Sequence, residues 1–548
     1  MSATPSRVAR SPVWLILAAS AWMTSVGNLA LWREFANLQL GWAFGIALAL
    51  LICALLTALL MPFAWRWTLK PVLAAALVAT AAGLHFMLAY NVLIDPTMLI
   101  NVLQTDPHEA ADLIGVRFFA TLMLLGVAPA IWLWRRPVAY GSLPRRLAGN
   151  LIGFGVAAVL LLAGGFALFQ PLASTARNHK PLRYLVNPVN SVYAVGWLAS
   201  RPFVRSGRRA AALTPLASDA RLGGSYAAGR KPALLVLVVG ETGRSGNFGL
   251  NGYARPTTPE LEREAVISQR NAWSCGTSTA ASLPCMFSHL GRERFESRDE
   301  EFENLVDVLQ RAGLAVIWLD NQSGCKGLCA RVPSAGPHPA VPCPDGECFD
   351  GVLLDGLDER IAALPVERRA RGIVVVLHPI GSHGPAYWRR SPTEFKRFLP
   401  ECRSLDLQAC SNEQLVNAYD NSIAYTEHFL AVTIRWLRTQ EATSEPALVY
   451  LADHGESLGE NNLYLHGMPY AIAPDVQKHV PWITWLSPAF EQRGAIDLAC
   501  LRQQQDRRIS HDNYFHSVLG LLDVGTEVYD RRLDLYANCS RRDGRSAG

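Results

Sequence analysis

The sequence is poor in charged residues for its length. Of its 548 residues only 18% are charged, whereas 50% are hydrophobic, and the mean hydropathy is +0.13. This composition excludes an intrinsically disordered chain and predicts that part of the protein lies in a membrane. The length also exceeds what a single hydrophobic core usually serves, so we expect more than one domain.

Excess positive charge is missing from the C-terminal two thirds. Residues 1–170 hold ten Arg and Lys against five Asp and Glu, which accounts for the whole net charge of +5. The remaining 378 residues hold 41 basic and 41 acidic residues. Because proteins that bind nucleic acids need excess positive charge to attract phosphates, the sequence predicts no nucleic-acid partner.

Five long apolar runs occupy the first third of the chain, where acidic residues are scarce. They cover residues 13–32, 40–65, 71–92, 116–134 and 147–170. Each is close to the roughly 20 apolar residues that cross a bilayer as a helix. A cleaved signal peptide would explain only the first run, so the sequence predicts an all-α membrane domain of five transmembrane helices.

The charges beside these runs predict their orientation. Basic residues precede the first run and follow the second and fourth: Arg7, Arg10, Arg66, Lys70, Arg135, Arg136, Arg145 and Arg146. The other two connections hold Arg33 with Glu34, and then the acidic residues Asp95, Asp106, Glu109 and Asp112. By the positive-inside rule the N-terminus is cytoplasmic. Five spans then place everything after Gln170 on the outer side of the membrane.

Cysteine is almost absent from the first third, which contains only Cys53, and ten cysteines follow. Four pairs are close in sequence, and exclusion leaves a fifth: Cys275–Cys285, Cys325–Cys329, Cys343–Cys348, Cys402–Cys410 and Cys500–Cys539. Even numbers in close pairs favour disulfides in an oxidising compartment. A zinc ribbon is disfavoured because no two pairs have the CxxC form at ribbon spacing.

Residues 171–230 separate the apolar third from the rest and mix Asn, Pro and Arg with short apolar stretches. The side chains of Trp197 and Phe203 favour a segment on the membrane surface, and a solvated linker is the alternative. We therefore expect a transmembrane domain at 1–170, an interfacial connector at 171–230 and an external globular domain at 231–548.

Four short apolar runs in the external domain end in polar residues. The runs are 233–240, 314–319, 372–377 and 447–452, and they lead into Glu241, Asp320, His378 and Asp453–His454. Amphipathic helical patterns cover 303–312 and 414–438. Because parallel α/β sheets place their sites at the carboxyl ends of strands, this pattern predicts a doubly wound α/β domain.

The side chains after these strands can bind a metal. Glu241, Asp453 and His454 offer two carboxylates and an imidazole, and His383 and His466 follow two of the strands closely. Oxygen and imidazole ligands in this mixture suit Zn²⁺, with Mn²⁺ as the alternative. The sequence therefore predicts a metal centre at this edge of the sheet.

A hydroxyl-rich segment, SCGTSTAAS at 274–282, supplies a candidate nucleophile. A Gly/Ser/Thr-rich turn that opens a helix presents backbone N–H groups to an anion and a hydroxyl to a metal. An ordinary capped helix start is the alternative. Composition alone does not choose among the hydroxyls.

Longer motifs carry a specific resemblance: VVGETGRSGNFGLNGY, SCGTSTAASLPCMFS, HPIGSHGPAYWRR, ADHGESLGENNLYLHGMPY, SHDNYFHSVLGLLDV and NVLQTDPHEA. They resemble the phosphoethanolamine transferases that modify lipid A, the family that includes the transferable colistin-resistance enzymes. The resemblance covers nearly the whole chain and implies a soluble domain of the alkaline-phosphatase and sulfatase fold. In the turn after Glu241 this sequence reads GRSGNFGL, where members of the family more often have ARADNFSL.

The resemblance also implies roles for single residues. The ligands of one tightly bound zinc ion would be Glu241, Thr279, Asp453 and His454, with Thr279 as the nucleophile. His383 and His466 would bind the substrate phosphate or a second metal during turnover and serve as general bases. Lys326 would hold the transferred headgroup, and Asn101, Thr105 and Glu109 would contact the lipid substrate.

The implied reaction moves phosphoethanolamine from phosphatidylethanolamine to lipid A of lipopolysaccharide, through a covalent phosphoethanolamine-threonine intermediate. It would lower the negative charge of the outer membrane and give polymyxin resistance. The implied enzyme is a monomer that crosses the bacterial inner membrane several times. Its partners are membrane lipids, and its catalytic domain lies in the periplasm.

Several alternatives remain at this stage. Inner-core heptose or Kdo could be the acceptor, and a glycerophosphate transferase similar to lipoteichoic acid synthase would share the five spans. A sulfatase-fold phosphodiester hydrolase is disfavoured because no CxPxR motif surrounds Cys275 or Cys285. A catalytically dead binding protein is disfavoured because Thr279 and all the metal ligands are present.

Overall fold

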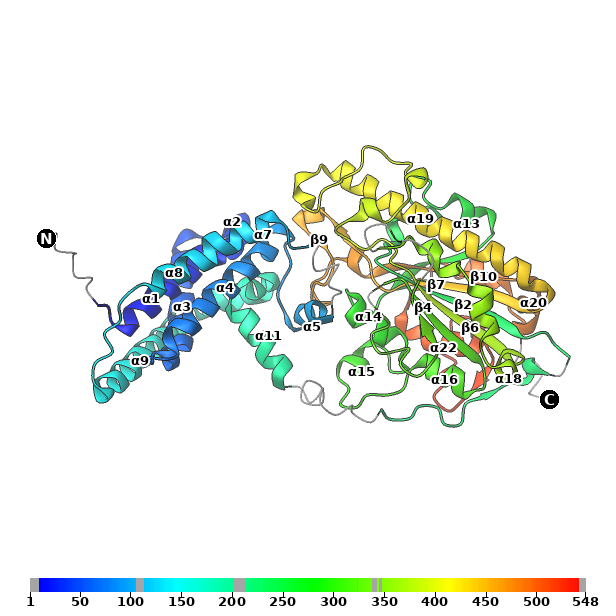
Figure 1. The fold of residues 1–548 in the computed structure, drawn as a ribbon, viewed down its shortest axis with the longest axis horizontal. Helices are drawn as coiled ribbons and strands as arrows, with labels where there is room; N and C mark the ends of the chain where they lie inside the picture. Colours follow the sequence, from blue (N-terminus) through cyan, green and yellow to red (C-terminus); the bar gives the residue numbers. More distant parts are fainter. Residues whose placement is uncertain are drawn as a thin grey trace. The chain divides into compact units, whose positions relative to one another are not determined.

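The computed structural model describes residues 9–104, 113–200, 213–227, 229–322, 324–337, 343 and 347–541. Contacts divide the chain into two compact units, Met1–Leu99 with His108–Arg205, and Ile100–Pro107 with Ser206–Gly548. The first unit is helical and the second contains the large sheet (Figure 1).

Five helices of the first unit are long and apolar enough to cross a membrane: Pro12–Asn37, Trp42–Phe63, Leu69–Ala89, Val116–Trp134 and Leu143–Ala167. The first comprises α1 (Pro12–Ser25) and α2 (Leu29–Asn37), and the fourth comprises α7 (Val116–Thr121), a π-helical turn and α8 (Ala128–Trp134). The others contain α3 (Trp42–Leu60), α4 (Leu69–Ala89) and α9 (Leu143–Ala167). All five predicted runs are confirmed as helices.

The segment after the fifth long helix also belongs to the first unit. It forms α10 (Phe169–Asn178) and α11 (Val189–Ser200). Between them the buried Asn187 donates from its side chain to the Thr80 carbonyl at 2.7 Å, and its backbone N–H donates to Asn28 Oδ1 at 2.8 Å. These bonds join the start of the predicted connector to the helix bundle, and its division at 170 and 230 stays a prediction.

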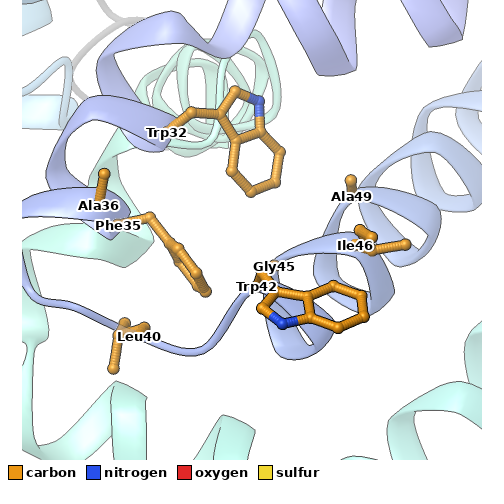
Figure 2. Close-up of a pocket in the computed structure, with 8 residues that line it drawn as sticks. All are labelled: Trp32, Phe35, Ala36, Leu40, Trp42, Gly45, Ile46 and Ala49. Atoms are coloured by element: carbon orange, nitrogen blue, oxygen red, sulfur yellow. The ribbon is translucent and has the colours of Figure 1, made fainter.

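An apolar pocket of about 400 Å³ lies between α2 and α3 (Figure 2). Its lining residues are Trp32, Phe35, Ala36, Leu40, Trp42, Gly45, Ile46 and Ala49. None of these eight carries an ionisable group. The pocket therefore offers no acid, base or metal ligand.

An eight-stranded sheet forms the centre of the second unit, in the order β11-β3-β10-β7-β2-β6-β4-β5. The four predicted strands are β2 (Ala233–Gly240), β4 (Ala315–Asp320), β6 (Gly372–His378) and β7 (Glu445–Ala452). They are parallel neighbours, buried along almost their whole length. Burial on both faces explains why they read as continuous apolar runs.

The sheet is mixed, because its remaining strands do not all follow the parallel direction. β10 (His479–Leu486) is antiparallel to both β7 and β3 (Ile267–Trp273). The short strands β5 (Ser334–Ala335) and β11 (Ile509–Ser510) lie at the edges. The sequence did not indicate these strands, because β3 is largely polar and β10 contains Pro481.

Helices cover both faces of the sheet (Figure 1). The two predicted helices are confirmed as α16 (Leu305–Arg311) and α19 (Asn412–Thr439). Figure 1 shows α19 on one side of the sheet, and α16 with α22 (Tyr514–Leu521) on the other. This layering leaves the carboxyl ends of β2, β4, β6 and β7 together at one edge.

The structure contains five disulfides: Cys275–Cys285, Cys325–Cys329, Cys343–Cys348, Cys402–Cys410 and Cys500–Cys539. These are the five predicted pairs. Cys53 is the free cysteine of the described chain.

Candidate active site

A cluster of metal-ligating side chains lies where β2 and β7 end. The two strands pair in parallel with Gly240 beside Ala452, so Glu241 emerges next to Asp453 and His454. One ligand atom from each of these three residues lies within 4.8 Å of the others, and all three are buried. No second group of this kind occurs among the residues that the structure describes.

Hydrogen bonds orient these ligands toward a common point. The Nδ1–H of His454 donates to the Gly455 carbonyl at 2.8 Å, so the Nε2 lone pair faces the carboxylates. Asp453 Oδ1 accepts from the backbone N–H groups of Thr242 and His454 at 3.1 and 2.7 Å. Its Oδ2 is buried and has no hydrogen-bond partner among the described atoms. The Nε2 of His454 lies 3.4 Å from Glu241 Oε1 and 3.5 Å from Asp453 Oδ2, an arrangement that fits a metal ion between them.

The charges of the three residues are strongly coupled. Burial raises the pKa of Glu241, but the hydrogen bond and charge of His454 outweigh it and hold that pKa well below its usual range. Burial and the neighbouring Glu241 raise the pKa of Asp453. Burial lowers the pKa of His454, but the two carboxylates outweigh it and raise the value to about 10. A positive charge is therefore strongly favoured here, either a proton or a metal ion.

One hydroxyl of the 274–282 segment points into this cluster. Thr279 begins α14 (Thr279–Met286), and its Oγ1 donates to Glu241 Oε2 at 3.0 Å and lies 3.4 Å from His454 Nε2. The Thr277 hydroxyl instead donates to the Met468 carbonyl at 2.6 Å. The hydroxyls of Ser274 and Ser282 bond to backbone groups of Gly276. Of these four hydroxyls only that of Thr279 contacts the ligand cluster, and it is the one that the resemblance implies; its role as the nucleophile stays a prediction.

Two further imidazoles line up beside His454. The ring centroids of His454 and His466 are 4.2 Å apart, and those of His466 and His383 are 5.7 Å apart. The Nδ1 of His466 lies 2.9 Å from the buried Glu456 carboxylate, so a proton shared there leaves Nε2 open. The two histidines predicted from the sequence therefore lie with the metal-ligand cluster.

Comparison with known proteins decides the family. A family model described as phosphoethanolamine transferase EptA/EptB matches residues 52–203, and a sulfatase model matches residues 233–524. Phosphoethanolamine transferase EptA of Escherichia coli K12 is 40% identical over 490 residues, which cover 87% of this chain and 86% of that protein. The chain belongs to the phosphoethanolamine transferase family.

Two further relatives extend the match over almost the whole transferase. Phosphatidylethanolamine transferase Mcr-1 of Escherichia coli is 36% identical over 539 residues, 95% of this chain and 97% of the relative. The solved integral membrane protein lipooligosaccharide phosphoethanolamine transferase A of Neisseria meningitidis matches with a TM-score of 0.90 at 35% identity. That match covers 97% of this chain and 100% of the other. The predicted family and fold class are confirmed.

The His383 loop of this transferase is held by residues that the sequence did not indicate. Arg390 donates from Nε to the His383 carbonyl at 2.8 Å. The buried Asp350 carboxylate accepts from the backbone N–H groups of Ile380 and Gly381. Gly381 has φ +53, and a Cβ there would lie 2.7 Å from the Glu241 carbonyl oxygen. The loop can approach Glu241 this closely only with glycine at that position.

Gln322 and His378 are site residues without a predicted role. Gln322 Nε2 donates to Glu241 Oε2 at 2.9 Å. His378 ends β6, and its Nδ1 lies 2.9 Å from Asp320 Oδ2. Burial raises the pKa of Asp320, but His378 outweighs it and lowers the value to about 2. The sequence indicated both Asp320 and His378 as strand-end residues, because each directly follows a predicted strand.

His511 connects the 274–282 segment to the end of β7. The Cys275 N–H donates to His511 Nδ1 at 3.1 Å, and His511 Nε2 lies 3.0 Å from the Ala452 carbonyl, just before Asp453. Burial lowers the pKa of His511 to about 3, so the ring is neutral and its Nε2–H donates. The SHDNYFHS motif contained this residue, but nothing in the motif indicated its two distant partners.

Four residues with predicted substrate-binding roles remain: Lys326, Asn101, Thr105 and Glu109. Lys326 has φ +49 in the turn that the Cys325–Cys329 disulfide closes, shortly after Gln322. Asn101 belongs to α5 (Pro96–Gln104), and its side chain is outside the described atoms. Thr105 and Glu109 also lie outside the described residues. The roles of all four stay predictions.

Proposed function

We propose that this transferase moves phosphoethanolamine from phosphatidylethanolamine to lipid A of lipopolysaccharide, with Thr279 as the nucleophile. The observation that carries the proposal is the Thr279 hydroxyl, 3.0 Å from Glu241 Oε2 inside the buried ligand cluster. The name of Mcr-1 supports phosphatidylethanolamine as donor, and the name of the Neisseria protein supports an acceptor of the lipooligosaccharide class.

Glu241, Thr279, Asp453 and His454 would together hold one zinc ion. Two carboxylates, an imidazole nitrogen and a hydroxyl make four ligands, the number that zinc prefers, and the orphaned Asp453 Oδ2 fits a ligand role. A bound zinc ion would supply positive charge that eases loss of the threonine proton and offsets the charge of the phosphate. His383 and His466 would bind the phosphate or a second metal.

The first half-reaction follows from the contacts of Thr279. Glu241 Oε2 accepts the proton of Oγ1 along the existing 3.0 Å hydrogen bond. The Oγ1 then forms a bond to the donor phosphorus, and the bond from phosphorus to the diacylglycerol oxygen breaks. His466 begins this step as an imidazolium held through Nδ1 by Glu456, gives its Nε2 proton to the departing alkoxide and becomes neutral. Phosphoethanolamine is left as an ester of Thr279, and diacylglycerol leaves.

The second half-reaction reverses these proton transfers. The neutral Nε2 of His466 accepts a proton from a phosphate hydroxyl of lipid A, whose oxygen attacks the phosphorus. The bond from phosphorus to Thr279 Oγ1 breaks, and Glu241 returns the proton to the hydroxyl. Adding an ethanolamine cation to lipid A lowers its net negative charge, which weakens attraction of cationic polymyxins.

The location fits a reaction between two membrane lipids. Five helices able to span a membrane anchor the chain, and five disulfides suit an oxidising periplasm. We therefore place the transferase in the bacterial inner membrane, with a cytoplasmic N-terminus and a periplasmic catalytic domain, acting as a monomer.

Mass spectrometry of lipopolysaccharide from cells with and without the gene tests this proposal. We expect phosphoethanolamine on lipid A only when wild-type protein is present, together with an increase in the polymyxin concentration needed to stop growth. Phosphoethanolamine on Kdo or heptose alone would identify an inner-core transferase. Unmodified lipopolysaccharide with free phosphoethanolamine released would identify a hydrolase.

A further inference from the structure

One end of the helix unit carries concentrated positive charge. We call it the basic end, and it comprises Arg10, Arg66, Lys70, Arg135, Arg136, Arg145 and Arg146. The sequence contains no Asp or Glu at 1–33, 35–94 or 113–200. The charge of the basic end is therefore not balanced by acidic residues of the helices that carry it.

Contacts among three chain segments assemble the basic end. The backbone N–H of Arg10 donates to the Pro137 carbonyl at 3.0 Å, and the Ala139 N–H donates to the Arg10 carbonyl at 3.0 Å. Lys70 at the start of α4 donates from Nζ to the Trp134 carbonyl at the end of α8, at 2.6 Å. The segment before α1, the start of α4 and the connection from α8 to α9 thus meet.

Two guanidinium groups share a pair of tryptophans at this end. Arg10 lies 5.1 Å from the ring centroid of Trp14, and Arg136 lies 4.3 Å from that of Trp132. The two indole rings are 5.9 Å apart. Neither guanidinium forms an ion pair with any residue that the structure describes. Both cations are therefore held in place by aromatic rings while their charge remains available.

A second set of cations lies around Tyr140. The Arg146 guanidinium is 5.8 Å from the Tyr140 ring centroid and donates to the Gly141 carbonyl. Arg66 lies close enough for its charge to act on the Tyr140 hydroxyl, and it covers the exposed ring of Trp67 at 5.3 Å. The basic end thus combines guanidinium groups with Trp and Tyr, the side chains that concentrate at membrane interfaces.

We infer that the basic end binds the headgroup phosphate of an anionic phospholipid. Guanidinium groups pair with phosphate oxygens through two N–H donors, and basic clusters beside transmembrane helices bind anionic headgroups. A phosphatidylethanolamine molecule would bring its ammonium group among these cations with no carboxylate to receive it. The site therefore differs in chemistry from the proposed donor site and does not depend on the proposed reaction.

Native mass spectrometry of the purified full chain in detergent tests this site, with phosphatidylglycerol, cardiolipin and phosphatidylethanolamine supplied separately. We expect both anionic lipids to be retained at least about tenfold better than phosphatidylethanolamine, with retention falling as salt rises. Cardiolipin retained better than phosphatidylglycerol would indicate that two phosphates are bound together. Equal retention of all three lipids would overturn the inference.

Paired variants locate the site. We expect the double variant Arg10→Gln and Arg136→Gln to lose about tenfold in anionic-lipid retention. The control Arg33→Gln and Arg183→Gln removes the same charge from two exposed arginines elsewhere in the unit, and we expect no change. Equal losses in both double variants, or no loss in the first, would contradict the assignment.

A charge-preserving variant separates lipid binding from insertion into the membrane, which also depends on these charges. Arg10→Lys with Arg136→Lys keeps the charge that orients the helices but removes the planar two-donor group. We expect it to insert normally and to retain anionic lipid several-fold less well than wild type. Wild-type retention would overturn the role of the guanidinium pair. Diacylglycerol release from phosphatidylethanolamine vesicles should be unchanged in each variant, since none alters the catalytic machinery.

Discussion

At the scale of single residues, the position of one hydroxyl group governs the proposed chemistry. Thr279 Oγ1 contacts Glu241 and His454, whereas Thr277 Oγ1 contacts the Met468 carbonyl. Both side chains are buried and they are two residues apart. Their different contacts make them a matched pair for testing the nucleophile.

Replacing Thr279 with Ala is expected to abolish transfer while metal content is retained through Glu241, Asp453 and His454. Thr279→Ser is expected to keep partial activity, because a primary hydroxyl can react but lacks the methyl group that restricts its rotamer. Diacylglycerol release from a fluorescent phosphatidylethanolamine, with intact mass of the peptide containing residue 279, measures both steps.

Thr277→Ala serves as the control for this prediction. It removes the hydrogen bond to Met468, so we expect a milder loss of activity and a phosphoethanolamine adduct still on Thr279. Wild-type turnover by Thr279→Ala, or an adduct on another hydroxyl, would show that the nucleophile is misassigned.

His511 is expected to matter for activity although it is not a ligand. His511→Ala breaks its bonds to Cys275 and Ala452, and each buried group left without a partner costs about 1–3 kcal/mol. Because these bonds hold Thr279 and Asp453 in register, we expect kcat to fall at least tenfold. His516→Ala removes another buried histidine, which accepts from the Asp530 N–H and bonds to the His289 backbone, away from the ligands. Comparable kcat values for the two variants, measured beside their unfolding midpoints, would refute a positioning role for His511.

At the scale of secondary-structure elements, a carboxylate of α19 caps the short helix α13 (Pro259–Arg263). Glu427 is buried and accepts from the backbone N–H groups of Glu260 and Leu261 at 3.1–3.3 Å. Burial raises the pKa of Glu427 to about 7. The folded chain therefore retains a proton that the unfolded chain releases at about pH 4.5.

This difference predicts how the contact responds to pH. Because the folded state binds the extra proton, the contribution of Glu427 to the free energy of unfolding falls as pH rises from about 4.5 to about 7. The expected fall is about 1–3 kcal/mol. Glu427→Gln removes this titration, so thermal unfolding of the variant and wild type across this range isolates it. Parallel pH profiles for the two proteins would contradict the assignment.

At the scale of the whole molecule, the orientation of the membrane helices decides on which side of the membrane the disulfide-bonded unit lies. The basic end lies before the first helix, on the connections 64–68 and 135–142, and in the first turn of α4 and of α9, and five candidate spans lie between the N-terminus and residue 170. We expect protease added to spheroplasts to digest residues 231–548 and to leave 135–146 protected. A reporter after Gly548 that works only in the cytoplasm would refute this orientation and the access of the site to its lipids.

Much of the architecture was predictable because it depends on local composition. The five membrane helices and the strands β2, β4, β6 and β7 are continuous apolar segments, and each was found within a few residues of its observed bounds. β3 and β10 were not found, since polar residues and Pro481 interrupt their patterns and only neighbouring strands define them.

The amino-acid sequence by itself determined the membrane spans, the central parallel strands, the five cysteine pairs and the types of side chain at the strand ends. Tertiary structure decided which of these side chains meet. Thr279 and Glu241 are 38 residues apart, and His511 and Cys275 are 236 residues apart. Local periodicity specifies the face or end on which a residue lies, but contacts across such separations depend on strand order and loop packing. The contact of Thr279 with Glu241, the His511 bridge and the contacts that assemble the basic end therefore emerged only in three dimensions.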